Sequence, residues 1–396
     1  MKRVLLALLV LSTTAVLAQN ELTIWTHFTE TRELEWLKSQ AVSYEEETGV
    51  RVDVVEVPFD DIRQKLVLGA PQGDAADLIV TIPHDWLGEL ASSGVLEPLG
   101  SLVETAELDI LEPVAVEALS YQGRLFGFPM FMEGIALLYN RELVAQAPET
   151  WDEFLAVARL HTTDSTFGFL YQLDIPYYGY GWWKSYGGYI FGESAEGGLN
   201  AQDIGLGGEA GYQAANFVKD LRYRYQLVPE GIDYPVANSA FIDGAAAMIL
   251  NGPWAVGDYR QAGLDFGIAP MPAPPGATEP WGPLVGVQGI VLNAYSTEKE
   301  AAAQFAEFLV QPSRQVSFNQ AGGRIPVAIQ AAETLADDPI VQGFSSSIAR
   351  GTPMPSIPEI GPAFDAWMNA LQLVLQSPDS DVEAIIDSMV EQLEGN

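Results

Sequence analysis

The alternation of short apolar runs with helix-like segments near the amino end constrains the fold more than any other feature of the sequence. The runs LTIW (22–25), VRVDVVEV (50–57) and DLIV (77–80) have the composition of strands, and the residues between them have helical periodicity. Strands that alternate with helices predict an α/β domain with a largely parallel sheet. Ligands of such sheets lie beyond the carboxyl ends of the strands. The segments 26–30 and 82–86, which follow the first and third strands, are therefore expected near a site.

The length of the chain and its later pattern predict a second domain. A chain of 396 residues, 48% of them apolar, suits two domains of ordinary size. Residues 121–140 have the pattern of consecutive strands, with Glu133 between two apolar runs. A segment rich in proline and glycine, 269–283, precedes the apolar strand VGVQGIVLN and predicts an ordered crossing between two lobes.

Local signals place several other elements. Thr150 followed by Glu153 is a capping box, which predicts the start of a helix. A further helix is expected near residues 208–226, and the apolar run 240–250 predicts a strand that leads into the turn NGPW.

The charge balance excludes some partners. The chain has 53 acidic and 19 basic residues, a formal net charge of −34. Nucleic acids and anionic membranes bind clustered lysine and arginine, so neither is expected as a partner. The excess of acidic side chains is interpreted as a solvated surface.

The absence of cysteine excludes several kinds of chemistry. With no cysteine, the chain has no disulfide, no thiolate metal site and no cysteine nucleophile. The acylated cysteine of a lipoprotein is also missing.

The first residues predict a secretory signal peptide over 1–18. Lys2 and Arg3 precede an apolar run, and small residues follow at Ala15 to Ala18, after which we expect cleavage. The apolar run is too short for a comfortable membrane span. A secreted two-domain protein without disulfides suits the periplasm, and the mature protein is expected to be soluble.

Motifs of common enzymes and metal sites are missing. The sequence has no GxSxG elbow, no Walker loop and no HExxH. Its three histidines, His27, His84 and His161, lie on separate segments, and two of them without a clear third ligand make a poor zinc site. No metal and no cofactor are expected.

Paired carboxylates leave one enzymatic alternative open. Glycoside hydrolysis needs two acids roughly 5–9 Å apart. Asp85, Glu133 and Asp174 are the candidates for such a pair, although hydrogen-bonding carboxylates are the favoured interpretation.

Aromatic residues gather in one stretch of the chain. Nine of the 21 residues from Tyr171 to Phe191 are aromatic, and six of these are tyrosines. Aromatic faces pack on the apolar faces of sugar rings, while neighbouring acids, amides and arginines bind the hydroxyls. The competing interpretation is packing inside a lobe, which we favour for Trp182, Trp183 and Tyr189.

At this level of detail the chain resembles the extracellular solute-binding proteins of sugar ABC transporters, and within them the maltose/maltodextrin-binding proteins. The matching stretches, in chain order, are LTIW, YEEETGVRVDV, DLIVTIPHDWLGELASSGVLEPL, GFPMFMEGIALLYNREL, TWDEF, IPYYGYGWWKSYGGY, AFIDGAAAMILNGPWAV, VGVQGIVLN and MPSIPEIGPAFDAW. They cover nearly all of the chain after the signal peptide.

The resemblance implies an α/β periplasmic-binding-protein fold of the type II kind, with a mainly parallel sheet in each of two lobes and three hinge crossings. The first lobe would comprise 19–131 and 287–331, and the second 132–286 and 332–396. The sugar would be enclosed by hinge bending.

The resemblance also implies the residues that bind the ligand. Asp85 and Glu133 would hydrogen-bond to hydroxyls, and Tyr177, Trp254 and Trp367 would stack on sugar rings. Trp86 stands where the family has a basic residue, and the first loop, with Thr26 and His27, lacks the family's usual lysine. Gln288 and Arg324 lie near the implied crossings and are further expected contacts.

These observations predict a monomeric periplasmic protein that binds maltose, trehalose or short maltodextrins without catalysis and delivers them to membrane permease subunits. Two alternatives remain at this point. One is a secreted glycoside hydrolase that acts on α-glucans, and the other is a binding protein for a charged solute such as a polyamine.

Overall fold

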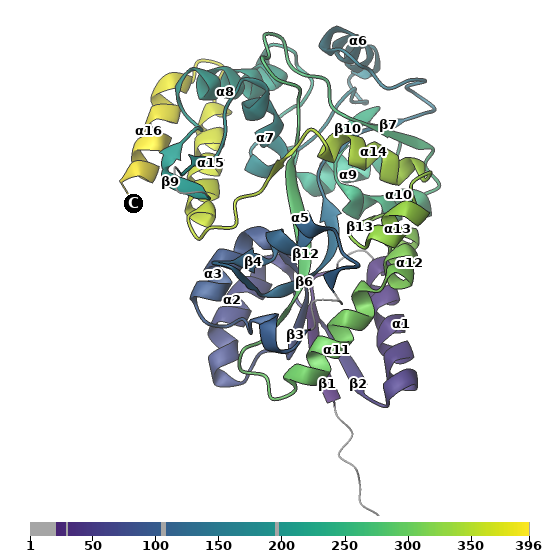
Figure 1. Ribbon diagram of the computed structural model, residues 1–396. Helices are drawn as coiled ribbons and strands as arrows, with labels where there is room; N and C mark the ends of the chain where they lie inside the picture. Colours follow the sequence, from purple (N-terminus) through teal and green to yellow (C-terminus); the bar gives the residue numbers. More distant parts are fainter. Residues whose placement is uncertain (1–20, 29–30, 104–107, 195–197, 396) are drawn as a thin grey trace, which may run out of the picture.

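The computed structural model describes residues 21–28, 31–103, 108–194 and 198–395. The predicted signal peptide, residues 1–18, lies outside the described residues. The described chain forms two lobes, with the amino-terminal strands in the lower lobe of Figure 1 and the carboxyl-terminal helices in the upper one. None of its helices is both long enough and apolar enough to cross a membrane.

The first lobe contains a mixed sheet with the strand order β13-β6-β12-β3-β1-β2. Its parallel half consists of β1 (Glu21–Thr26), β2 (Arg51–Glu56) and β3 (Leu78–Pro83). The helices α1 (Thr31–Thr48) and α2 (Phe59–Gly69) connect these strands. The alternation of strands and helices predicted from the sequence is confirmed here.

Strands from later parts of the chain complete this sheet. They are β6 (Gly127–Glu133), β12 (Leu284–Leu292) and β13 (Ile325–Pro326); β12 pairs antiparallel with β3 and β6, and β13 pairs antiparallel with β6. β14 (Thr352–Pro353) pairs in parallel with the beginning of β12. Because β12 lies between β3 and β6, residues far apart in the sequence meet at its middle.

The sheet of the second lobe is antiparallel, so the prediction of a mainly parallel sheet is wrong for this lobe. β7 (Ala136–Asn140) lies in the middle and pairs antiparallel with β10 (Met248–Asn251) and β11 (Phe266–Ala269). Composition marks these runs as strands, but their direction depends on which neighbours the long connections bring beside β7.

The remaining elements are mostly helices. Those packed in the first lobe are α3 (Leu87–Ser92), α5 (Pro113–Ala118), α11 (Lys299–Val310), α12 (Pro312–Gly322) and α13 (Ile329–Thr334). Those of the second lobe are α6 (Trp151–His161), α7 (Pro176–Ser185), α8 (Gly208–Tyr223), α9 (Tyr234–Ile242), α10 (Val256–Gln261), α14 (Pro339–Ile348), α15 (Ile360–Val374) and α16 (Val382–Glu394). The short hairpins are β4 (Ser120–Tyr121) with β5 (Arg124–Leu125), and β8 (Phe191–Glu193) with β9 (Leu199–Ile204).

Two local predictions have different outcomes. The capping box of α6 is confirmed, because the Thr150 hydroxyl accepts from the N–H of Glu153 at 3.3 Å and the Glu153 carboxylate accepts from the N–H of Thr150 at 3.2 Å. The strand predicted over 240–250 is partly wrong, since α9 continues to Ile242 and β10 begins at Met248.

Each lobe has its own hydrophobic core. Residues on the two faces of the first-lobe sheet form separate clusters, one under α1 and α11 and the other under α2 and α3. The larger cluster of the second lobe includes the fully buried Trp182, Trp183, Trp281 and Trp367. Packing is therefore confirmed for Trp182 and Trp183. It is wrong for Tyr189, which is 39% exposed and donates to Asp203 at 2.7 Å.

The chain passes between the lobes after β6, before β12 and between α13 and α14 (Figure 1). Glu133, which the predicted bounds place in the second lobe, is the last residue of β6 in the first-lobe sheet. The exact boundaries of the lobes remain a prediction.

Candidate functional site

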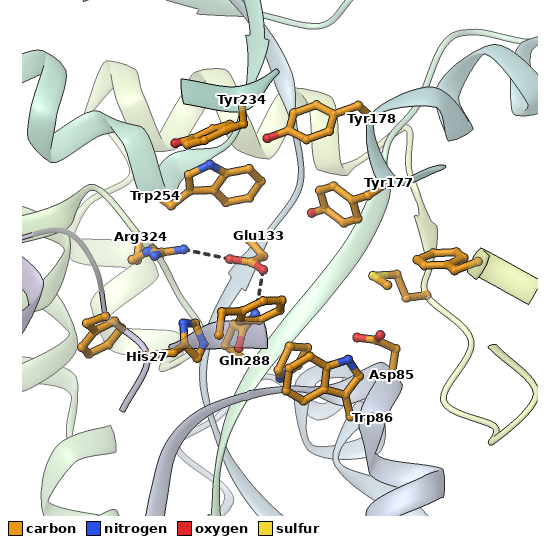
Figure 2. A pocket seen from close by; sticks show the side chains of 15 residues that line it. His27, Asp85, Trp86, Glu133, Tyr177, Tyr178, Tyr234, Trp254, Gln288 and Arg324 are labelled. Carbon is orange, nitrogen blue, oxygen red and sulfur yellow. Dashed lines mark hydrogen bonds and ion pairs between the residues drawn. The ribbon is translucent and has the colours of Figure 1, made fainter. Parts of the chain in front are cut away.

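A cavity of about 540 Å³ lies between the two lobes, and side chains of both lobes line it (Figure 2). His27, Asp85 and Glu133 come from the first lobe, and Tyr177 and Trp254 come from the second. The volume falls within the range of about 300–1,000 Å³ that is typical of small-molecule sites. This cavity is the candidate site.

The sheet of the first lobe places the polar side chains of the site. His27 follows β1, and Asp85 follows β3 in the 3-10 turn His84–Trp86. Glu133 is the last residue of β6, and Gln288 of β12 is in register with the end of β3. His27, Asp85 and Glu133 line one cavity because the ends of β1, β3 and β6 meet at one edge of the sheet, and Gln288 joins them because it pairs with the last residue of β3.

His84 holds the turn that carries Asp85 and Trp86. Its Nδ1 accepts from the N–H of Val287 at 3.0 Å, and its Nε2 lies 3.0 Å from the carbonyl oxygen of Met354, to which it donates in the neutral tautomer. Burial lowers the pKa of His84 to about 4, so the neutral ring that makes both hydrogen bonds persists at neutral pH. The turn is thereby tied to β12 and to the segment after β14.

A buried ion-pair cluster stands behind Glu133. Arg324 Nη1 donates to Glu133 Oε2 at 2.8 Å, and Gln288 Nε2 donates to Glu133 Oε1 at 2.8 Å (Figure 2). Arg324 also binds both carboxylate oxygens of Glu33, through Nε at 2.5 Å and Nη2 at 2.9 Å. Burial raises the pKa of Glu33, and the guanidinium of Arg324 opposes that shift.

Four polar atoms at the cavity have no partner among the described residues. They are His27 Nε2, Asp85 Oδ1, Tyr177 Oη and Gln288 Oε1, and each of them is buried. A buried polar group without a hydrogen bond is costly, so a set of them around one cavity indicates a ligand with several hydrogen-bonding groups.

Burial also changes the protonation of these groups. It raises the pKa of Asp85 to about 7 and lowers the pKa of His27 to about 4, and it raises the pKa of Tyr177 well above its ordinary value. At neutral pH His27 is therefore uncharged, Tyr177 keeps its proton, and Asp85 is only partly ionised. The site suits an uncharged polar ligand better than a cation.

Aromatic rings face the cavity from both lobes. In the second lobe the ring centroids of Tyr177 and Trp254 are 6.0 Å apart, and those of Tyr177 and Tyr178 are also 6.0 Å apart. In the first lobe Phe59 lies 4.8 Å from Trp86, centroid to centroid. Such rings supply apolar faces of the size of a sugar ring.

The local sequence explains how the second-lobe rings reach the cavity. Pro176 begins α7, so Tyr177 lies in its first turn. Trp254 follows β10 in the 3-10 turn Pro253–Ala255, after Gly252. A Cβ atom on Gly252 would lie 2.1 Å from the ring of Trp254, so only glycine leaves room for this orientation of the indole.

The structure brings eight of the ten predicted ligand contacts to the cavity. These are His27, Asp85, Trp86, Glu133, Tyr177, Trp254, Gln288 and Arg324. Whether they bind a ligand remains a proposal.

The other two predicted contacts do not line the cavity, and these placements are corrections. Thr26 is fully buried, and its hydroxyl accepts from the N–H of Phe28 at 3.3 Å. Trp367 is fully buried in the second-lobe core, with its ring centroid 4.8 Å from that of Trp183. Phe364, one turn nearer the start of α15, lines the cavity instead, because Trp367 belongs to the buried face of that helix.

Sequence reasoning missed several other lining residues. They are Phe59, Tyr178, Tyr234, Met354 and Phe364, whereas Phe28 and Pro83 lie in the segments 26–30 and 82–86 that were expected near the site. Phe59 follows β2, so the rule that sites lie beyond strand ends would have found it. Met354 and Phe364 both lie in the stretch MPSIPEIGPAFDAW that carries the family resemblance, but Trp367 was chosen from it as the ring that would reach the ligand.

The candidate acids separate into two groups. Asp85 and Glu133 line the cavity, whereas Asp174 binds the side-chain amides of Gln172 at 3.1 Å and Gln372 at 3.2 Å. In the part of the chain that the structure describes, no group of three or more His, Asp or Glu side chains is arranged to hold a metal ion.

Comparison with protein families identifies a relationship over most of the chain. Residues 39–343 match the family described as bacterial extracellular solute-binding protein. A maltotriose-binding protein of Pyrococcus abyssi is 29% identical over 383 residues, which cover 93% of this chain and 81% of that protein. A galactooligosaccharide-binding protein of Bacillus subtilis is 28% identical over 390 residues, which cover 95% of this chain and 89% of that protein.

Comparison with solved structures supports the same family relationship. The Thermus thermophilus maltotriose binding protein, solved with maltotriose bound, is 54% identical and superposes with a TM-score of 0.92. The similarity covers 94% of this chain and 99% of that chain. The two-lobed fold is thus the one found in proteins of this kind.

Proposed function

This chain belongs to the bacterial extracellular solute-binding proteins, and we propose that it captures a short α-glucan, such as maltose, trehalose or a maltodextrin, between its lobes. The observation that carries the proposal is the set of four unpartnered polar atoms placed between aromatic walls in one cavity. An uncharged ligand with hydroxyls around apolar ring faces satisfies both features. The maltotriose-bound relative with 54% identity supports a ligand of this class.

The proposed cycle uses the two-lobed fold. Only a closed form contacts the sugar with both lobes, so binding shifts the population from open to closed. The closed monomer then delivers the sugar to the permease subunits of an ABC importer in the bacterial membrane, with the periplasm as the proposed compartment. We propose binding without hydrolysis, because Asp85 and Glu133 are expected to bind hydroxyls.

Tryptophan fluorescence tests the proposal directly, because Trp86 and Trp254 line the cavity. The protein is titrated with glucose, maltose, trehalose, maltotriose and a galactooligosaccharide, with spermidine as the charged control. We expect saturable changes with the α-glucans and none with spermidine. No response to any α-glucan at millimolar concentration would contradict the proposal.

Chromatography of the sugar tests the absence of catalysis. We expect maltotriose to remain intact after long incubation with the protein. Release of glucose or maltose would instead support the alternative of a glycoside hydrolase.

A further inference from the structure

The first-lobe wall of the cavity is backed by a chain of four hydrogen-bonded side chains. In order they are Glu33, Arg324, Glu133 and Gln288, and Figure 2 shows the last three. Glu33 is 1% exposed and does not line the cavity, whereas the other three do. We call these four residues the acceptor relay.

The first link of the acceptor relay fixes the guanidinium of Arg324. Two of its nitrogens bind the two carboxylate oxygens of Glu33, in the fork geometry that gives arginine its orientation. The ring of Phe131 lies under the guanidinium, with 4.7 Å between the ring centroid and Cζ. Arg324 Nη1 is thereby aimed at Glu133.

The second link fixes the orientation of Gln288. Glu133 accepts at Oε2 from Arg324 and at Oε1 from Gln288 Nε2. A carboxylate only accepts hydrogen bonds, so the amide of Gln288 must turn its NH₂ group toward Glu133. Gln288 Oε1 is then left buried at the cavity without a partner, as Asp85 Oδ1 is.

From this geometry we propose that the acceptor relay makes the first-lobe wall a hydrogen-bond acceptor, and that Glu33 is a positioning residue that acts through Arg324 and Glu133. The wall then selects ligands whose hydroxyls donate at the positions of Gln288 and Glu133. This proposal rests on the proposed sugar-binding function. It adds that the sugar hydroxyls donate the hydrogen bonds and the first-lobe wall accepts them.

Substitution of Gly322 is a second way to displace the side chain of Glu33. A Cβ atom on Gly322, the last residue of α12, would lie 2.4 Å from Glu33 Oε1. Replacing Gly322 by alanine therefore displaces the carboxylate of Glu33 and removes no polar group.

A double-mutant cycle tests the relay. We expect Glu33→Gln to weaken maltotriose binding about tenfold in the wild-type background, and by less than about twofold in the Glu133→Gln background, because residues in one network are coupled. Glu35→Gln is the matched control, since Glu35 is exposed on the same helix. It should leave the affinity unchanged in both backgrounds.

Maltotriose analogues with one hydroxyl replaced by fluorine test the polarity, because fluorine does not donate a hydrogen bond. We expect at least one analogue to bind wild-type protein about tenfold more weakly than maltotriose. A loss of this size corresponds to one hydrogen bond to a buried or charged acceptor. The same analogue should lose most of this penalty in Glu33→Gln.

The outcomes separate the two proposals. An equal loss of affinity in both backgrounds, no loss with Glu33→Gln, or an unchanged fluorine penalty overturns the relay while sugar binding by wild-type protein still stands. If wild-type protein binds no sugar, both proposals fail. If Glu33→Gln does not fold, Gly322→Ala takes its place in the same cycle with the same expected results.

Discussion

The two faces of the cavity are built in different ways. On the first-lobe face, Glu133 and Gln288 are held at 2.8 Å hydrogen-bond distances by partners that are themselves buried. On the second-lobe face, the rings of Tyr177 and Trp254 are held by packing, with 6.0 Å between centroids. Hydrogen bonds depend steeply on distance and angle, whereas burial of apolar surface does not. We infer that the first lobe discriminates among sugars and that the second lobe supplies non-directional binding energy.

Among the substitutions considered, removal of Arg324 is expected to change the protein most, because it disrupts the hydrogen bonds of the first-lobe face. Arg324→Met leaves the carboxylates of Glu33 and Glu133 buried without their shared cation, which should lower the free energy of unfolding by about 3–5 kcal/mol. Urea unfolding measures it.

The matched control for Arg324→Met is Arg141→Met. It breaks the exposed ion pair of Arg141 with Asp265, whose side chains are 45% and 62% exposed. That pair should contribute less than about 1 kcal/mol. Equal effects of the two substitutions would mean that the buried cluster does not organise the first-lobe face.

Truncation of Trp254 should affect binding and leave the core intact. Trp254→Ala removes a ring from the second-lobe face, and we expect about 1–3 kcal/mol weaker binding of maltotriose, by analogy with aromatic anchors at interfaces. Isothermal titration calorimetry measures the change.

Trp367→Phe is the contrasting variant on the same lobe. Because Trp367 lies in the core, its substitution should lower the melting temperature and leave the affinity for maltotriose nearly unchanged. A loss of affinity in Trp367→Phe with unchanged stability would return this residue to the site.

The pH dependence of binding tests the role of Asp85. Burial raises the pKa of Asp85 to about 7, and a hydroxyl that donates to its oxygen favours the charged form and lowers the pKa in the complex. The affinity should therefore be highest above pH 7 and fall as the pH decreases through 7, by at most about tenfold per pH unit.

Calorimetric titrations between pH 5 and 8.5 measure this dependence. His27 has a pKa of about 4 and titrates below that range. Asp85→Asn should bind with an affinity that is independent of pH. The same slope in that variant would assign the dependence to another group.

Loss of the Tyr177 hydroxyl should have the smallest effect. Tyr177→Phe keeps the ring and removes an oxygen that has no partner among the described residues, so binding should weaken by about 0.5–1.5 kcal/mol if the sugar bonds to it. Comparison with Tyr177→Ala in the same assay separates the hydroxyl from the ring. An unchanged affinity in Tyr177→Phe would leave Tyr177 as a stacking residue only.

Much of the first-lobe face could be predicted from the sequence. His27 and Asp85 follow apolar strands of an α/β pattern, and the ends of parallel strands meet at one edge of the sheet. The site role of Glu133 came from the position between two apolar runs together with the family resemblance. Trp86 was predicted because it lies in the segment after the third strand and stands where the related family has a basic residue.

The errors have a common physical cause. Trp367 and Phe364 are three residues apart on α15, and only the packing of that helix decides which ring enters the core. Tyr189 was expected to be packed but is 39% exposed, and its hydroxyl donates to the carboxylate of Asp203. The direction of the second-lobe strands likewise depends on long connections.

Local patterns in the chain were sufficient for the strand and helix alternation, the capped start of α6, and the class of side chains at the strand ends. These features depend on neighbours within a few residues, whose influence is written in spacing and composition. The partnership of Glu33 with Arg324 joins residues 291 positions apart and was decided only by the tertiary structure. Charged side chains carry no periodic signal of their partners, so only the fold of the first lobe shows which side chains orient this wall of the cavity.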